Sequence, residues 1–172
     1  VFIGLGNPGE KYKHNRHNAG HALIDYFNEQ IRNSKFEIRN KQQMSNLKLL
    51  KTDCFMNVSG KFVKKHVPSS MLQALHIVHD DLDIPLGKFK IQFGTGPKLH
   101  NGILSIEEEL ETNEFWRIRI GVDGRPSTSS GQFVTRTDGE TYSLQDFTSE
   151  EQQQLQPVFE NIYKQLQHQK II

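Results

Sequence analysis

Segments with the apolar pattern of a β-strand alternate along this chain with segments that have the apolar period of an amphipathic helix. Val1–Ile3 is a short apolar run that predicts a buried strand, and the apolar residues of the stretch 20–32 then recur at helical spacing. The same alternation continues towards the end of the chain. It favours a single α/β domain over residues 1–172, because alternating strands and helices bury their apolar faces in a layered architecture.

The remaining elements follow from the same patterns. Further strands are expected at residues 36–39, 47–52, 75–80, 88–93 and 115–122, with an acidic loop directly after residue 80. Further helices are expected shortly after residue 58, over 103–110 and from Ser149 onward, where Pro157 either bends the helix or marks its true start. The stretch PSTSSG, residues 126–131, is typical of a surface loop.

The composition is that of a soluble globular protein, with 24% charged and 35% hydrophobic residues. No apolar run approaches the roughly 20 residues that a bilayer-spanning helix needs, so no membrane association is expected. The lone Cys54 excludes an internal disulfide and a cysteine-based zinc cluster, and it suits a reducing compartment. Because the first residue is Val rather than Met, we expect a trimmed chain, and a cytoplasmic and a mitochondrial location both stay open.

The charge is distributed unevenly, although the net charge is only +1. Residues 1–100 hold 15 Lys and Arg against 8 Asp and Glu, whereas residues 101–172 hold 6 against 12. The basic part of the chain indicates a polyanionic partner such as a nucleic acid. Ordinary solvated charge on two surfaces is the alternative.

The first glycine-rich loop, GLGNPG, fits the dinucleotide-binding pattern G-x-G-x-x-G. That fingerprint needs a helix that begins inside the loop, so that its amide groups face the pyrophosphate. The residues that follow, EKYKHNRHNAG, are polar and show no apolar stripe before Leu23. The acidic residue at a suitable distance, Asp25, lies inside the helical pattern. We therefore interpret the loop as a turn that presents Asn7 beside histidine and asparagine side chains.

Two clusters resemble metal sites, but neither has a convincing pattern, and no metal is expected. Three histidines could bind zinc if they shared one helical face, yet their stretch is poorly patterned as a helix: His14, His17 and His21. Three carboxylates form an acidic run that lacks the longer spacing of a calcium loop: Asp80, Asp81 and Asp83.

Five motifs together resemble the bacterial-type peptidyl-tRNA hydrolase family. They are GLGNPGEKYKHNRHNAG (4–20), FMNVSG (55–60), HDDLDIPLG (79–87), HNG (100–102) and RIRIGVDGRP (117–126), in family order and at compatible spacing. The resemblance implies a twisted mixed sheet, largely parallel and flanked by helices. It also implies a monomeric hydrolase without a cofactor, which cleaves the ester joining a peptide to the 3′ ribose of tRNA and contacts the tRNA 3′ end and acceptor stem.

Carried over by motif, the resemblance implies that His17 is the catalytic histidine and Asp80 its acidic partner. Ester hydrolysis needs a base that activates water, and a neutral histidine suits this task because its unperturbed pKa is about 6.5. A carboxylate on the other ring nitrogen fixes the tautomer and stabilises the imidazolium that forms. The chemistry therefore agrees with the implied roles.

The resemblance implies three asparagines as the polar lining of the site, Asn7, Asn57 and Asn101. An amide donates a hydrogen bond without carrying charge, so it can hold a developing oxyanion or position the water. We expect Asn101 to serve the water or the leaving group and Asn57 to anchor the substrate. Tyr12 and Met56 are expected to border the pocket, with a place in the core as the alternative.

The chain departs from the family pattern in two places near these motifs. The family's glycine-rich stretch typically ends GGHNG, and here it reads PKLHNG, so that Lys98 stands where glycine is expected. We predict that Lys98 contacts a tRNA phosphate. Asn15 stands where the family commonly has Thr before RHN. The other lysines considered as phosphate contacts, each with solvated charge as the alternative, are Lys61, Lys64, Lys65, Lys88 and Lys90.

Two functions from other classes compete with the hydrolase. One is a non-catalytic RNA-binding relative of the splicing type, and the altered loop fits such reuse. The presence of His17 and Asp80 argues against it, because RNA binding alone needs no general base. The other is a nicotinamide-dependent oxidoreductase, which only the three glycines of GLGNPG support.

Overall fold

A five-stranded sheet forms the centre of the computed structural model, which describes residues 1–33, 47–125 and 138–172. The strand order is β2-β1-β3-β5-β4, and all neighbours are parallel except β4, which runs antiparallel to β5. The expected mixed, largely parallel sheet is confirmed. The strands are β1 (Phe2–Gly4), β2 (Leu49–Lys51), β3 (His76–Pro85), β4 (Phe89–Phe93) and β5 (Trp116–Asp123).

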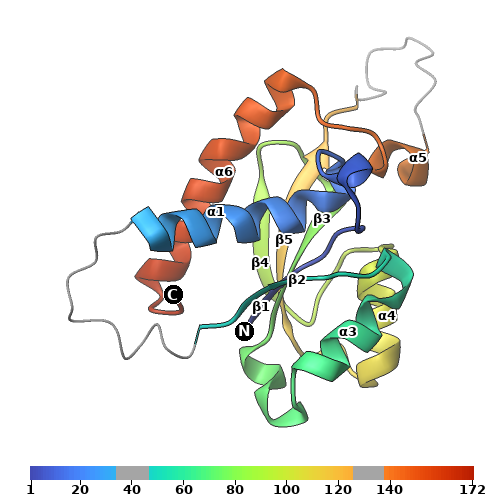
Figure 1. Cartoon of the computed structure of the whole chain (residues 1–172), viewed down its shortest axis with the longest axis vertical. Helices are drawn as coiled ribbons and strands as arrows, with labels where there is room; N and C mark the ends of the chain where they lie inside the picture. The colour runs from blue at the N-terminus through green and yellow to red at the C-terminus, as the bar shows by residue number, and fades with distance from the viewer. Residues whose placement is uncertain (34–46, 126–137) are drawn as a thin grey trace.

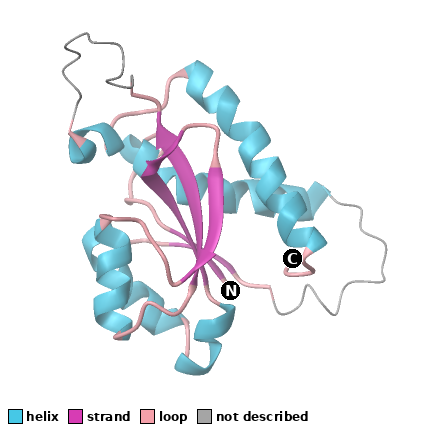
Figure 2. Cartoon of the chain, turned by 180° about the vertical axis from the view of Figure 1, so that it is seen from behind, coloured by secondary structure: helices cyan, strands magenta, loops and turns pink. Residues whose placement is uncertain are grey.

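Helices cover both faces of the sheet (Figures 1 and 2). One face packs against α1 (Ala19–Asn33) and α6 (Ser149–His168), and the other against α3 (Ser59–His66) and α4 (Asn101–Leu110). Strand side chains alternate between the faces, so Val78 joins the α1 and α6 side while Ile77 joins the α3 and α4 side. A short helix, α5 (Gly139–Ser143), precedes α6. None of the helices in these described ranges is long and apolar enough to cross a membrane.

Strand β3 is longer than the sequence pattern predicted. The expected acidic loop after residue 80 is wrong, because β3 continues to Pro85, which pairs with Asp123 of β5 after a register shift. The acidic residue Asp81 is compatible with a central strand because Arg119 of β5 donates to its carboxylate at 2.6 Å. The expected strand at 36–39 and the expected loop at 126–131 lie outside the described residues.

Helix α6 begins where its sequence signals place it and continues through Pro157. Thr148 and Glu151 form a capping box in which the side chain of each accepts from the other's backbone N–H. Pro157 is exposed, so water can solvate the carbonyl group that its ring leaves without a partner. The alternative that Pro157 marks the true start of the helix is wrong.

The start of α1 packs at very short distance against the end of β1 and the first half of β3. A Cβ atom on Gly20 would lie 2.4 Å from the carbonyl oxygen of Val78 and 2.6 Å from that of Leu5. Glycine permits this approach because it has no side chain. The segment just before α1, which contains His17, is therefore held beside the end of β1 and the middle of β3.

We predict that Gly20→Ala destabilises the protein by at least about 2 kcal/mol, because the added methyl group meets backbone atoms that cannot move aside separately. Asn28→Ala on the exposed side of the same helix is the control, and it should change stability by less than about 0.5 kcal/mol. Urea unfolding of the three proteins measures the difference. A wild-type midpoint for Gly20→Ala would contradict the close packing described here.

Candidate active site

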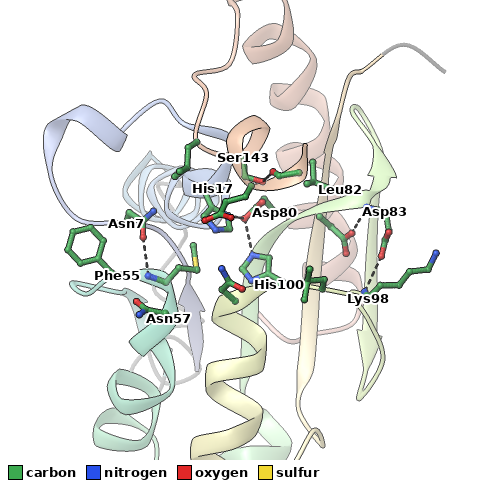
Figure 3. Close-up of a pocket in the computed structure, with 17 residues that line it drawn as sticks. Asn7, His17, Phe55, Asn57, Asp80, Leu82, Asp83, Lys98, His100 and Ser143 are labelled. Carbon is green, nitrogen blue, oxygen red and sulfur yellow. Dashed lines mark hydrogen bonds and ion pairs between the residues drawn. The ribbon is translucent and has the colours of Figure 1, made fainter. Parts of the chain in front are cut away.

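A pocket of about 780 Å³ opens beyond the carboxyl end of β1 and beside the middle of β3 (Figure 3). The loop after β1 and two 3-10 turns, η2 (Arg16–Asn18) and η4 (Met56–Val58), contribute to its wall. The rest comes from Phe55 before η4, from β3, from Lys98–His100 with the first residue of α4, and from α5 with Leu144 directly after it. Carboxyl ends of parallel strands are the usual place for a ligand site in an α/β protein. The seventeen lining residues come from segments far apart in the chain.

A buried carboxylate, that of Asp80 on β3, joins the two histidines of the pocket. Its residue is 1% exposed, and its Oδ1 lies 2.8 Å from Nδ1 of His17. Burial alone raises the pKa of a carboxyl group, but the nearby His17 and His100 outweigh it and hold the pKa of Asp80 well below its usual range. Asp80 is therefore an ionised acceptor at neutral pH.

His17 has a pKa above its ordinary value of 6.5. Burial lowers this pKa, but the charge of Asp80, its hydrogen bond and the charge of Glu140 raise it by more. Because Nδ1 faces Asp80, Nε2 is the nitrogen left for the pocket (Figure 3). The ring is thus oriented to accept a proton from a group in the pocket.

His100 binds the same oxygen of Asp80 from the other side, at 3.0 Å through Nε2. Its Nδ1 accepts the backbone N–H groups of Gly102 and Ile103, at 3.1 and 3.3 Å, and so caps helix α4. The ring proton must therefore sit on Nε2, which donates to Asp80. Sequence reasoning missed His100 as a site residue. The available signal was the histidine of the HNG motif, a few residues before the expected helix.

One potential ligand atom from each of three side chains, His17, Asp80 and His100, lies within 4.8 Å of the other two, as the ligands of a metal ion would. The donor set argues against a metal, because Nε2 of His100 carries the proton that its capping role requires. The three side chains fit a hydrogen-bond network better. Members of the two metal-like clusters considered from the sequence have other partners in the structure. Nε2 of His21 lies 3.1 Å from the hydroxyl oxygen of Thr52, and Asp81 pairs with Arg119.

Asn7 ties two walls of the pocket together. Its backbone exchanges hydrogen bonds with the side chain of Asn18, at 2.8 and 3.0 Å. Its Oδ1 accepts the backbone N–H of Met56 at 3.0 Å. Asn7 is buried, and the amide oxygen is committed to the fold, so its contribution is to fix the loops around the pocket.

The structure brings most of the other expected residues to the pocket. Asn57 in η4 and Asn101 at the start of α4 are exposed and line it, and Met56 lines it as well although it is buried. Lys98 lies at the rim, where its backbone N–H donates to Asp83, and its side chain extends away from the centre (Figure 3). Tyr12 is not part of the lining and meets it only through an edge contact with Phe55.

Three apolar side chains at the rim were not anticipated. Phe55, Leu99 and Leu144 are 53%, 77% and 43% exposed, and all three line the pocket. Exposed apolar groups gathered at a cavity indicate a binding surface for a partly apolar ligand. The sequence gives no signal for them, because an apolar residue in a loop is equally expected in the core.

Comparisons with known proteins agree on one family. The family model for peptidyl-tRNA hydrolase matches residues 1–170. Peptidyl-tRNA hydrolases of Pseudothermotoga lettingae and Campylobacter curvus are both 38% identical; the matches cover 88% and 93% of this chain and 79% and 83% of theirs. The crystal structure of the Acinetobacter baumannii peptidyl-tRNA hydrolase superposes with a TM-score of 0.67 at 25% identity, covering 92% of this chain and 82% of that one. The chain belongs to the peptidyl-tRNA hydrolase family.

Proposed function

We propose that this protein hydrolyses the ester bond between a peptide and the 3′ ribose of tRNA. The observation that carries the proposal is the His17–Asp80 pair, whose free ring nitrogen faces a pocket bordered by side-chain amides. A base held by a buried carboxylate is the arrangement that activates water. The relatives named above are called peptidyl-tRNA hydrolases, which supports this ester as the substrate.

In the proposed reaction, Nε2 of neutral His17 removes a proton from a water molecule as that water attacks the ester carbonyl. The imidazolium that forms is stabilised by the ionised Asp80. When the tetrahedral intermediate breaks down, the C–O bond to the ribose is cleaved and His17 returns the proton to the 3′ oxygen. The products are the peptide carboxylic acid, which ionises in solution, and tRNA with a free 3′ hydroxyl group. No step requires a metal or an organic cofactor.

The two exposed asparagines stand on different walls of the pocket, which supports different tasks. Asn101 begins α4 next to His100, close to the Asp80 network, and we assign it to the water or the leaving group. Asn57 lies in η4 on the wall of Phe55, and we assign it to anchoring the substrate. An amide suits both tasks because it donates without bringing a charge into the site.

The alternatives explain less of the structure. A protein that only binds RNA has no need of an ionised carboxylate buried beneath a histidine, since such a group is costly to bury. A dinucleotide site needs a helix that begins inside the glycine loop, whereas here 3-10 turns follow the loop and α1 begins only at Ala19.

We further propose that the protein works as a monomer on the tRNA 3′ end and acceptor stem. One chain supplies the whole pocket wall described above. Because the relatives named above come from bacteria, we place the activity in the cytoplasm rather than in a mitochondrion.

Hydrolysis of an N-acetylated aminoacyl-tRNA tests the function and its base together. Wild-type protein should release the N-acetyl amino acid, and His17→Ala should lower turnover by at least about 10²-fold with tRNA binding retained. His14→Ala is the matched control, because His14 is exposed three residues away. No hydrolysis by the wild type would refute the function, and full activity of His17→Ala would refute the mechanism.

The role of Lys98 is tested by the salt dependence of tRNA binding. Each phosphate contact contributes about one unit to the slope of log affinity against log salt, so Lys98→Ala should weaken binding and lower this slope by about one. Lys164→Ala is the control, because Lys164 lies on α6, pairs with Glu160 and is not among the candidate phosphate contacts. An unchanged slope for Lys98→Ala would identify Lys98 as ordinary surface charge, in line with its outward direction in Figure 3.

A further inference from the structure

The turn that carries His17 is fastened to the protein on both sides of this residue. On the carboxyl side, Asn18 exchanges hydrogen bonds with the backbone of Asn7 in the loop after β1. On the amino side, Arg16 reaches Asp146, between α5 and α6, and Glu151 in the first turn of α6, more than 120 residues away in the chain. The side chain of His17 contacts Asp80 and the ring of His100, whereas its two neighbours tie the turn to other segments and so position its backbone.

Arg16 is enclosed, with 4% of its surface exposed, and its guanidinium group makes polar contacts in several directions. One terminal nitrogen donates to Oε2 of Glu151 at 2.5 Å, and the other donates to the carbonyl oxygens of Asp146 and Gln145, at 2.8 and 3.2 Å. The group also lies over the ring of Tyr142, 4.1 Å from its centroid. These contacts join the His17 turn to both helices at the C-terminal end.

Backbone hydrogen bonds join the same parts of the chain, the residues before His17 and the segment between α5 and α6. The N–H of Arg16 donates to the carbonyl oxygen of Gln145 at 3.1 Å, and that of Phe147 donates to His14 at 3.0 Å. The Asn15 amide donates to the carbonyl oxygen of Leu144. Residues 14–16 and 144–147 are thus paired like a short antiparallel ribbon, and this ribbon ends immediately before His17.

We propose that Arg16 is a positioning residue that, through Glu151, holds His17 against Asp80. The inference rests on the proposed function for its effect on turnover, but its structural part stands by itself. A planar guanidinium group is needed because it meets a carboxylate and two carbonyl groups at once, which the ammonium group of lysine cannot reproduce. The same junction carries α5, so it also fixes the pocket wall formed by Ser143 and Leu144.

Glu151 allows the ion pair to be broken without breaking the helix. Its side chain closes the capping box of α6 through the backbone N–H of Thr148, at 2.9 Å, and glutamine can fill the same capping role. Glu151→Gln therefore removes the charge opposite Arg16 while leaving the cap. An enclosed guanidinium group without its counter-ion is strongly unfavourable, so the His17 turn should move.

Arg16→Lys is the complementary variant, because it keeps the positive charge and loses the planar geometry. Any change in the pKa of His17 then results from a new position of its ring rather than from a change in the charge nearby. Glu150→Gln is the matched control for both: it removes one exposed negative charge from the same first turn of α6. Circular dichroism and thermal unfolding establish that each variant is folded at the temperature of the experiment.

The test is an NMR titration of the His17 ring in the free protein, combined with kcat and KM on N-acetylated aminoacyl-tRNA. The charged or titratable groups that face His17 are Asp80 on β3, His100 before α4 and Glu140 on α5. If the His17 ring moves away from Asp80, the pKa-lowering effect of burial is no longer offset. The pKa of His17 should therefore fall by about half a unit or more in both variants. We also expect kcat to fall at least about tenfold, with KM changed less than about threefold.

The outcomes separate the inference from the proposed function. If the wild type is inactive on the ester but the His17 pKa falls in both variants, the positioning role stands and the proposed function fails. If the pKa and kcat of Arg16→Lys and Glu151→Gln match those of Glu150→Gln, the positioning role is refuted. Lower kcat with an unchanged His17 pKa, or unfolding of both variants while the control folds, also contradicts it, because Arg16 then serves only general stability.

Discussion

One buried carboxylate oxygen determines how the site is built. Oδ1 of Asp80 accepts hydrogen bonds from His17 and His100, and ionised carboxylates are stable in a protein interior only when such donors are supplied. The two donors come from the turn before α1 and from the residue that caps α4. The carboxylate therefore fixes three elements relative to one another, and the mutual placement of the other pocket residues follows from theirs.

The fold supplies this arrangement through short backbone distances and strand alternation. Gly20 lets α1 approach the carbonyl oxygen of Val78, two residues before Asp80 in β3. Successive strand residues point in different directions, so the carboxylate of Asp80 meets His17 and His100 whereas that of Asp81 pairs with Arg119 of β5. Adjacent carboxylates are thus held apart, each with its own partners.

The sequence predicted the architecture because apolar periodicity is a local property. Recognisable motifs singled out His17, Asp80 and the asparagines as candidate site residues, and the structure gathers them around one pocket. The sequence did not predict the extension of β3, which depends on pairing with β5 and on a buried ion pair between distant residues. It also missed His100, whose role depends on which ring nitrogen faces the helix. Tyr12 was expected at the pocket, yet the turns around it place it behind Phe55.

The pH dependence of kcat/KM in wild-type protein and Asp80→Asn tests the central claim most directly. Asp80 raises the pKa of His17 above 6.5, and only the neutral ring can act as base, so wild-type activity should rise with pH through that elevated pKa. Asparagine has no charge to raise it, so in Asp80→Asn the rise should move to lower pH, and the plateau should fall by at least about tenfold because the ring is no longer oriented. Profiles with the same midpoint and the same plateau would contradict a base organised by the buried carboxylate.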